Sequence, residues 1–238
     1  MRRGGGVASR EYVPESMKLM IRHTVQDFAE LRRMMVEQQI RGRGVRDERV
    51  LEAMLAVPRH EFVPQTFVDE AYADKPLPIG EGQTISQPYM VAVMSEALEL
   101  AGTERVLEVG TGCGYQAAVL SLLAREVYSV ESNATLALDA QKRLERLGYA
   151  NIHVRTGDGT LGLPELAPFE GIVVTAAAPR VPEPLAEQLA EGGRLVIPVG
   201  SESEQDLLAL RREGEKTIAR VVNHCRFVPL VGRYGWRS

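Results

Sequence analysis

The feature that most restricts the fold of this chain is a short apolar run that ends in glycines and leads into a helical segment. Arg105 to Val109 has the β-branched content of a buried strand, Gly110 to Gly114 follows it, and a helical pattern then extends to about Ala124. Glycine has no Cβ, so the backbone can turn sharply and approach a ligand closely. In doubly wound sheets this turn lies beyond the carboxyl end of a strand, where ligands bind.

The second half of the chain continues this alternation of strands and helices. Predicted strands cover 127–130, 152–155, 171–175 and 194–199, and predicted helices cover about 114–124, 133–147 and 182–189. Strands separated by helices of this length are typical of βαβ units in a parallel sheet. Two late apolar runs, 205–210 and 221–230, predict a closing hairpin. We therefore expect an α/β fold with a doubly wound, mostly parallel, Rossmann-like sheet.

The first part of the chain predicts helices and a packed loop. Apolar residues recur at helical spacing from Phe28 to Ile40, and Arg41 to Gly44 ends that pattern. Asp47 is placed to cap a second helix that stops at Pro58. From there to residue 88 the sequence is rich in proline, glycine and aromatic residues, which favours a packed functional loop with little regular structure. A further helix follows Pro88.

These patterns suggest one domain with an extension. Residues 1–28 form the N-terminal extension, expected to be a flexible tip followed by a helix, because the stretch lacks the apolar core of an export signal. Residues 29–238 form a single domain. Within it, 29–88 is a helical and loop cap for the substrate, and 89–238 is the Rossmann-like core that binds the cofactor.

The glycine turn also discriminates between cofactors. A nicotinamide-binding turn has the spacing G-x-G-x-x-G, whereas this turn has G-x-G-x-G, and Tyr115 stands where a packing glycine belongs. Glu108 lies two residues before the turn. A carboxylate there disfavours a diphosphate and favours a cationic ligand. The turn thus favours S-adenosylmethionine over a nicotinamide dinucleotide.

Two acidic positions follow later strands. Glu131 ends the second strand of the core, where a carboxylate can accept hydrogen bonds from both ribose hydroxyls. Asp158 and Gly159 end the third strand and are expected to reach the adenine edge. Carboxyl ends of neighbouring parallel strands meet at one sheet edge, so these groups and the glycine turn predict one nucleoside site.

Composition excludes several classes of protein. The net charge of -4 gives no support to a nucleic-acid clamp. No apolar run approaches the length that spans a membrane. Cys113 and Cys225 are far apart and lack metal-ligand spacing, and the four histidines occur singly, so we expect neither a disulfide framework nor a metal site. These features favour a cytoplasmic protein without membrane or nucleic-acid partners, and we expect a monomer.

The segment Pro76 to Met90 (PLPIGEGQTISQPYM) resembles the signature loop of the protein-L-isoaspartate O-methyltransferases, which are class I S-adenosylmethionine-dependent enzymes. The similarity continues through 106–120, 127–131, 157–159, 172–179 and 195–200, and 227–230 resembles the last strand of the family. It covers roughly residues 30 to 232. Cys113 stands where the family commonly has serine, and a small residue still fits there.

The resemblance implies the cofactor, substrate and site residues. The cofactor is S-adenosyl-L-methionine, which leaves as S-adenosyl-L-homocysteine, and the partners are isoaspartyl-containing proteins and peptides. The expected cofactor-binding residues are Gln83, Thr84, Ile85, Ser86, Glu108, Gly110, Gly112, Cys113, Gly114, Glu131, Asp158 and Gly159. The expected catalytic residue is Ser86. The expected substrate-binding residues are Ile79, Ser86, Val228, Pro229 and Leu230.

The implied reaction is methylation of the α-carboxylate of an L-isoaspartyl residue, followed by spontaneous succinimide formation and partial repair. That carboxylate is already ionised at neutral pH, so no general base is required. Ser86 would orient it, although a serine before Pro88 is also placed to cap the following helix. Three alternatives stay open at this point: another methyl acceptor such as a small acid or RNA, a binding protein or adaptor without chemistry, and a nicotinamide oxidoreductase.

Overall fold

A computed structural model describes residues 28–237. The extension predicted over residues 1–28 therefore lies outside the described residues, apart from Phe28. In the part of the chain that is described, no helix combines the length and the apolar character needed to cross a membrane.

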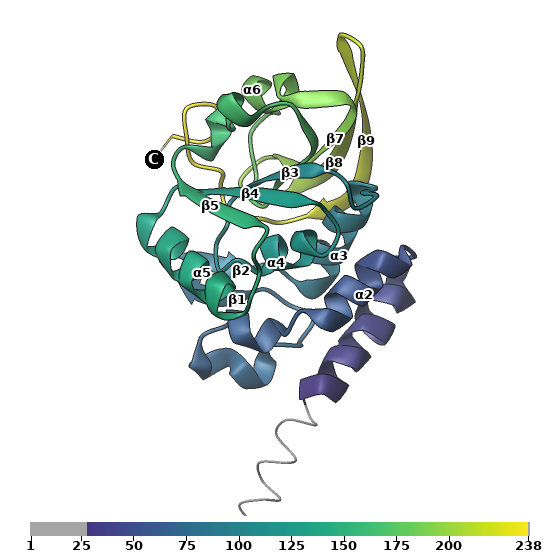
Figure 1. The fold of residues 1–238 in the computed structure, drawn as a ribbon, viewed down its shortest axis with the longest axis vertical. Coiled ribbons are helices and arrows are strands. Elements are labelled where there is room, and N and C mark those ends of the chain that lie inside the picture. The colour runs from purple at the N-terminus through teal and green to yellow at the C-terminus, as the bar shows by residue number, and fades with distance from the viewer. Residues whose placement is uncertain (1–27, 238) are drawn as a thin grey trace, which may run out of the picture.

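The centre of the molecule is a seven-stranded sheet with the order β5-β4-β3-β6-β7-β8-β9 (Figure 1). The strands are β3 (Arg105–Val109), β4 (Glu126–Glu131), β5 (Ile152–Thr156), β6 (Phe169–Val174), β7 (Leu189–Gly200), β8 (Gln205–Glu213) and β9 (Lys216–Cys225). The first five are parallel, and β8 and β9 are antiparallel additions at one edge. The predicted mostly parallel sheet is confirmed.

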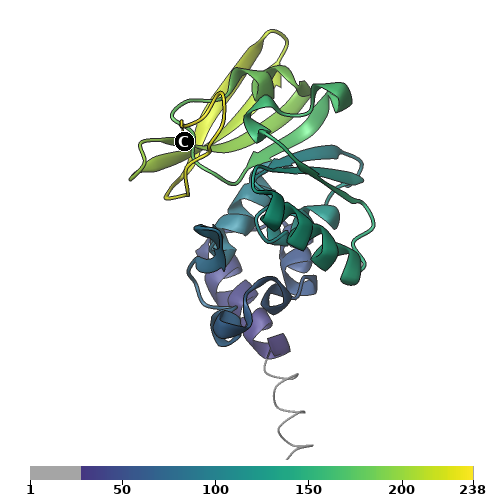
Figure 2. The same ribbon diagram turned by 90° about the vertical axis from the view of Figure 1, so that its left-hand side faces the viewer.

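Helices cover both faces of this sheet. On one face lie α3 (Pro88–Ala97), α4 (Tyr115–Ser121) and α5 (Ala134–Arg146), and on the other lie α6 (Glu183–Glu187) and the 3-10 turns η5 (Gly159–Leu161) and η6 (Pro164–Leu166) (Figures 1 and 2). Glycine at the start of α4 and Asn133 at the start of α5 mark the helix N-termini predicted from sequence. This arrangement is the doubly wound α/β fold expected from the strand and helix alternation.

Alternation along the strands divides the core into two layers. Val106 and Val173 face the helices α2 to α4, whereas Leu107 and Ile172 face α6 on the opposite side. Successive side chains in a strand point to opposite faces of the sheet, so each strand contributes to both layers. Strands buried on both faces are therefore apolar throughout, which explains their continuous apolar runs.

The N-terminal layer follows the sequence prediction. Residues 28–34 are α-helical and continue into the π-helical turn η1 (Met35–Ile40) and the 3-10 turn η2 (Arg41–Arg43). Gly44, at φ +106°, ends the segment. Helix α2 (Glu48–Ala56) starts at Asp47, whose side chain accepts a hydrogen bond from the Arg49 N–H. It ends before Pro58, as predicted.

The segment 58–88 is more regular than expected. It contains the 3-10 helices η3 (Arg59–Phe62) and η4 (Gln65–Glu70) and a small antiparallel hairpin of β1 (Leu77–Gly80) and β2 (Gln83–Ile85). The strands are short and β1 contains a proline, which a strand tolerates at an edge. Alternation over three or four residues is too brief to be read from sequence, which explains the omission.

The last predicted strand is displaced. The run 221–230 was expected to form the second strand of the closing hairpin, but β9 begins at Lys216 and ends at Cys225. Residues 227–230 instead cross the sheet edge, where the Ala177 N–H donates to the Val228 carbonyl (2.8 Å) and the Leu230 N–H donates to the Ala177 carbonyl (2.7 Å). The hairpin is confirmed, whereas the predicted position of its second strand is wrong.

Candidate active site

A crevice lies at the carboxyl ends of β3, β4 and β6, where a doubly wound sheet binds its ligand. Its walls come from the β2 segment, the first turns of α3 and α4, the glycine turn, the segments that follow β4, β5 and β6, and the crossing segment before the C-terminus. The lining residues are Gln83, Thr84, Ile85, Ser86, Val91, Val109, Gly110, Thr111, Gly112, Cys113, Tyr115, Gln116, Val130, Glu131, Ser132, Asn133, Gly159, Thr175, Ala176, Val228, Pro229, Leu230 and Val231.

The glycine turn is held by contacts that a side chain would disrupt. Gly110 has φ +95°, and a Cβ built there would lie 2.4 Å from the Thr175 Oγ1 atom. That hydroxyl donates to the Gly110 carbonyl at 2.6 Å. The end of β6 is thereby fastened to the turn after β3. Only glycine fits this position, because both the positive φ and the contact exclude a larger residue.

Glu131 joins the turn to the end of β4. Its side chain is only 7% exposed, and its Oε2 accepts a hydrogen bond from the Gly112 N–H at 2.8 Å. Its Oε1 accepts from the Asn133 N–H at 3.0 Å. A carboxylate has about four lone-pair directions, so capacity remains for hydroxyl donors from a ligand. This is the arrangement expected for a residue that holds a ribose.

A second groove meets the crevice. It is lined by Arg43, Pro76, Thr84, Ser86, Gln87, Tyr89, Met90, Thr175, Glu202, Asn223, His224, Cys225, Arg226, Phe227, Val228 and Pro229. Five residues line both spaces: Thr84, Ser86, Thr175, Val228 and Pro229. A ligand in the crevice and a ligand in the groove would therefore meet at these five residues. The geometry suits transfer of a group between two molecules.

Ser86 lies at this junction and is half-buried. Helix α3 begins after Gln87, and no side chain caps its N-terminus. Gln87 instead donates to the Asp74 side chain at 2.8 Å. Over residues 28–237 we find no hydrogen bond of the Ser86 hydroxyl to protein. The alternative prediction that Ser86 caps this helix is therefore wrong for the described structure.

The comparison with known families decides the classification. The model of the family "Protein-L-isoaspartate(D-aspartate) O-methyltransferase (PCMT)" matches residues 30–235. The chain belongs to this family.

A relative and a solved structure, both above 30% identity, agree with the assignment, and a second solved structure shares the fold. The chain is 57% identical over 211 residues to "Protein-L-isoaspartate O-methyltransferase" of Geobacter metallireducens, covering 88% of this chain and 98% of that protein. A solved protein-L-isoaspartate O-methyltransferase is 32% identical, has a TM-score of 0.78, and covers 86% of this chain and 67% of that one. A Plasmodium falciparum protein, described as a putative member and solved with S-adenosyl-L-homocysteine, has a TM-score of 0.72 at 24% identity, over 86% of this chain and 98% of that one.

Most positions predicted for this family's site lie on the crevice wall. From the cofactor set these are Gln83, Thr84, Ile85, Ser86, Gly110, Gly112, Cys113, Glu131 and Gly159, and from the substrate set Val228, Pro229 and Leu230. Their roles in binding remain predictions. Four other predicted positions do not line it.

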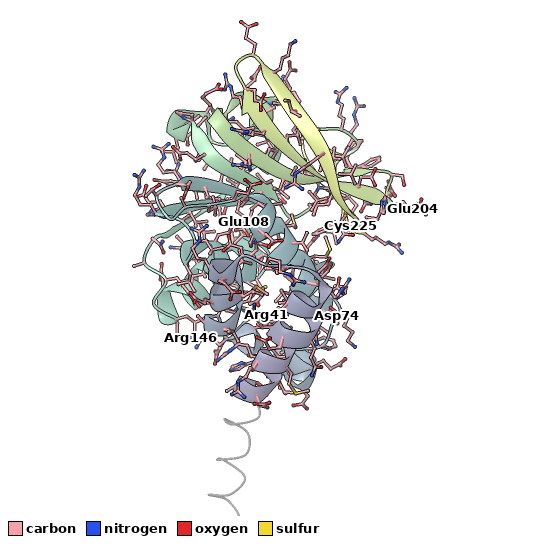
Figure 3. All side chains as sticks on the ribbon, turned by 90° about the vertical axis from the view of Figure 1, so that its right-hand side faces the viewer. Arg41, Asp74, Glu108, Arg146, Glu204 and Cys225 are labelled. Atoms are coloured by element: carbon pink, nitrogen blue, oxygen red, sulfur yellow. The ribbon has the colours of Figure 1, made fainter. Side chains whose placement is uncertain are left out.

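Glu108 is the first of these four positions. Glu108 lies in the interior of the molecule (Figure 3) and is fully buried. Its carboxyl group accepts a hydrogen bond from the Ser129 hydroxyl. Ser129 is in turn 2.5 Å from the Thr111 hydroxyl, which does line the crevice. Burial raises the pKa of Glu108 to about 8, with the nearby Glu131 adding to the rise and the Ser129 hydrogen bond opposing it. Glu108 does not line the crevice, and its predicted contact with the cofactor stays a prediction.

Gly114, Asp158 and Ile79 are the other three. Gly114 supports helix packing, because a Cβ there would lie 3.2 Å from Leu144. Asp158 accepts hydrogen bonds from the Thr160 N–H (2.9 Å) and hydroxyl (2.6 Å) and from the Arg233 N–H (2.8 Å). Ile79 packs on the glycine turn, with its Cδ1 3.3 Å from the Cβ position of Gly112. These three residues do not line the crevice and instead support the segments that do.

Burial also raises the pKa of the Cys113 thiol, which disfavours the thiolate form that a nucleophile needs. Sequence reasoning missed Thr175 and Ala176, which directly follow β6. Their place at the carboxyl end of a parallel strand could have indicated them. It also missed Gln116, on the first turn of α4, for which the sequence carries no signal.

Proposed function

We propose that this chain transfers a methyl group from S-adenosyl-L-methionine to the α-carboxylate of L-isoaspartyl residues in damaged proteins and peptides. Membership of the family and 57% identity to a relative that bears this name support the proposal. The observation that carries it is Ser86, whose side chain borders both the crevice and the groove. A donor and an acceptor bound in those two spaces would meet beside its hydroxyl.

The residues of the crevice fit the proposed cofactor. Glu131 offers carboxylate oxygens to ribose hydroxyls, and the glycine turn presents backbone without side chains in between. When bound, S-adenosylmethionine supplies an electrophilic methyl group attached to a sulfonium. Val91, Val109 and Val130 give the same walls an apolar component, which suits exclusion of water from the reacting atoms.

The groove offers a cationic side chain to an acceptor carboxylate. Arg43 and Arg226 line it and are exposed, and Arg43 lies over the Tyr89 ring, 3.6 Å from the ring centre. Arg43 is paired with the Asp74 carboxylate at 3.0 Å and Glu202 lines the same groove, whereas Arg226 has no carboxylate partner among residues 28–237. Arg226 is therefore the side chain that attracts an acceptor carboxylate. The crossing residues Val228 and Pro229 supply backbone against which a peptide with an isoaspartyl bend can lie. Main-chain contacts of this kind suit substrates of varied sequence.

The chain's own contribution is binding and alignment. The acceptor carboxylate is ionised at neutral pH, so no residue has to remove a proton. The Ser86 hydroxyl donates a hydrogen bond to one carboxylate oxygen, and the other oxygen attacks the methyl carbon. A C–O bond forms as the C–S bond breaks, which leaves a methyl ester and a neutral thioether. Alignment of two bound reactants can lower the barrier by roughly 7–11 kcal/mol in favourable cases.

The test combines an acceptor comparison with a Ser86→Ala variant. Wild-type protein is incubated with methyl-labelled S-adenosylmethionine and two peptides that differ only in an isoaspartyl or aspartyl linkage. We expect label on the isoaspartyl peptide alone. In Ser86→Ala we expect turnover to fall at least about a hundredfold, while the affinity for S-adenosylhomocysteine changes less than about threefold.

Ser203→Ala is the matched control, because Ser203 is exposed in the β7–β8 connection and lines neither space. It should retain wild-type turnover. Label on the aspartyl peptide alone, or on neither peptide, would contradict the proposed acceptor. Normal turnover in Ser86→Ala would contradict the role of Ser86 and leave the acceptor assignment intact.

We also propose that the protein acts as a monomer in the cytoplasm and without nucleic acid. Its two cysteines are both free, which is typical of proteins kept in a reducing compartment. Size-exclusion chromatography with light scattering checks the oligomeric state, and a dimer at micromolar concentration would contradict it.

A further inference from the structure

The segment near the C-terminus folds back along one wall of the crevice. Residues 230–236, the C-terminal strap, form a closed loop in which the Trp236 N–H donates to the Leu230 carbonyl at 2.7 Å and the Gly232 N–H donates to the Trp236 carbonyl at 3.2 Å. Leu230 and Val231 line the crevice, and Val231 is 44% exposed. A ligand that fills the crevice would therefore contact the strap.

The two ends of the strap are fixed by the segment that follows β6. The Leu230 N–H and the Trp236 indole N–H both donate to the Ala177 carbonyl, at 2.7 Å and 3.0 Å. Ala177 also donates its own N–H to the Val228 carbonyl at 2.8 Å. Val228 and Pro229, which border the groove, are thus held by Ala177 and not by the middle of the strap.

The middle of the strap is fixed by Asp158, two residues after β5. Its Oδ2 accepts the Arg233 N–H at 2.8 Å, and its Oδ1 accepts the N–H and the hydroxyl of Thr160 at 2.9 Å and 2.6 Å. The Thr160 hydroxyl in turn accepts the Tyr234 N–H at 3.1 Å. The strap backbone lies directly on this carboxylate, because a Cβ built at Gly232 would be 2.2 Å from Oδ1. Asp158 and Thr160 therefore hold two successive main-chain N–H groups of the strap.

These contacts join two walls of the crevice through a residue that does not line it. Gly159, next to Asp158, lines the crevice from the β5 side, and Val231 lines it from the strap. Hydrogen bonds from N–H groups to a carboxylate are stronger than those between neutral groups. Without the carboxylate, the Arg233 N–H loses its acceptor while the Ala177 contacts remain. The position of Val231, between Leu230 and Arg233, then depends on one anchor where it had two.

We propose that Asp158 is a positioning residue for the cofactor, whose carboxylate holds the strap so that Val231 forms a fixed wall against the bound ligand. The proposal rests on the proposed function, because it takes S-adenosylmethionine as the ligand of the crevice. A wall that is ordered before the ligand arrives lowers the cost of binding. Asp158 thus acts on cofactor affinity through the strap, and the groove beside Ser86 keeps its geometry without it.

Calorimetry and fluorescence test the two parts of this proposal without turnover. In Asp158→Ala, the Kd for S-adenosylhomocysteine should rise about tenfold or more, because the wall is no longer ordered in advance. Trp236 is the only tryptophan of the chain, so acrylamide quenching of its fluorescence reports on the strap. The quenching constant should rise about twofold or more as the strap opens locally. Asp139→Ala, which removes an exposed carboxylate from α5, should match wild type in both measurements.

Asp158→Asn keeps the size of the side chain and tests the same idea if Asp158→Ala does not fold. Its amide has one acceptor oxygen where the carboxylate has two, so both measurements should change in the same direction by a smaller factor. Turnover of an isoaspartyl peptide at saturating S-adenosylmethionine should stay within about threefold of wild type in either variant, because alignment at Ser86 does not involve the strap.

A second probe separates positioning from direct contact. S-inosylhomocysteine carries hypoxanthine in place of adenine and so lacks the amino group that a carboxylate could bind. If Asp158 acts through the strap, its loss weakens both probes by the same factor. A loss confined to S-adenosylhomocysteine, an unchanged Kd, or unchanged quenching of Trp236 would overturn the inference. These binding results together with no methylation of isoaspartyl peptides by wild type would instead defeat the proposed acceptor alone.

Discussion

Replacing Glu108 by glutamine should remove most of the loss of stability that the protein suffers between mildly acidic and mildly alkaline pH. The Glu108 side chain is fully buried, and no basic side chain is among the neighbours that shift its pKa. Its Oε1 has no hydrogen-bond partner among residues 28–237. Burial raises its pKa from the ordinary 4.5 to about 8. Between those values the unfolded chain ionises this carboxyl and the folded protein keeps it protonated.

The sign and size of the effect follow from proton linkage. In that interval the folded state binds more protons, so the free energy of unfolding falls as the pH rises. The contribution of Glu108 is fully present below pH 4.5 and is lost by about pH 8. At about 1.4 kcal/mol per pH unit, the total is roughly 5 kcal/mol. A neutral amide of similar shape does not titrate, so Glu108→Gln should become more stable relative to wild type as the pH rises.

Urea denaturation at pH 5, 6, 7 and 8 measures this difference. The gap between the unfolding free energies of Glu108→Gln and wild type should widen by about 1 kcal/mol or more per pH unit. Glu145→Gln, on the exposed surface of α5, controls for the removal of a negative charge from the chain. If the curves of Glu108→Gln and wild type run parallel from pH 5 to 8, the buried carboxyl is not neutral in the folded protein and the reasoning is wrong.

Two other predictions concern the walls of the crevice. Gly110→Ala should destabilise the protein by about 3 kcal/mol or more in thermal or urea unfolding, because its Cβ would lie 2.4 Å from Thr175 Oγ1 at φ +95°. Gly148→Ala is the control, because Gly148 has a similar φ of +83° and no atom within 4 Å of its Cβ position; it should lose only about 1–2 kcal/mol of stability. Equal losses of stability in the two variants would refute the argument from the Thr175 contact. Glu131→Gln should raise the Kd for S-adenosylhomocysteine about tenfold or more, measured by calorimetry, and an unchanged Kd would show that its carboxylate does not hold the ligand.

The sequence predicted the parts of the structure that depend on local interactions. The parallel strands, the N-cap Asp47 and the glycine turn all follow from residues within a few positions of each other. The same logic reached Glu131, because the carboxyl ends of neighbouring parallel strands always share one edge. The predicted boundaries failed in two places. The strands of the hairpin β1–β2 are too short for their alternation to be read from sequence, and the apolar run 221–230 does not coincide with β9, which ends at Cys225.

What only the tertiary structure decided is which side chains share a space. Position in the sequence suggested that Glu108 faces the ligand, yet strand alternation and the approach of α4 place its carboxyl in the core beside Ser129. The placement of Ser86 between the crevice and the groove depends on contacts between segments far apart in the chain. The anchor of the C-terminal strap joins Asp158 to Arg233, 75 positions later in the chain. Periodicity reports the face that one element buries, whereas a site forms from the register and packing of several elements, which no single stretch of sequence encodes.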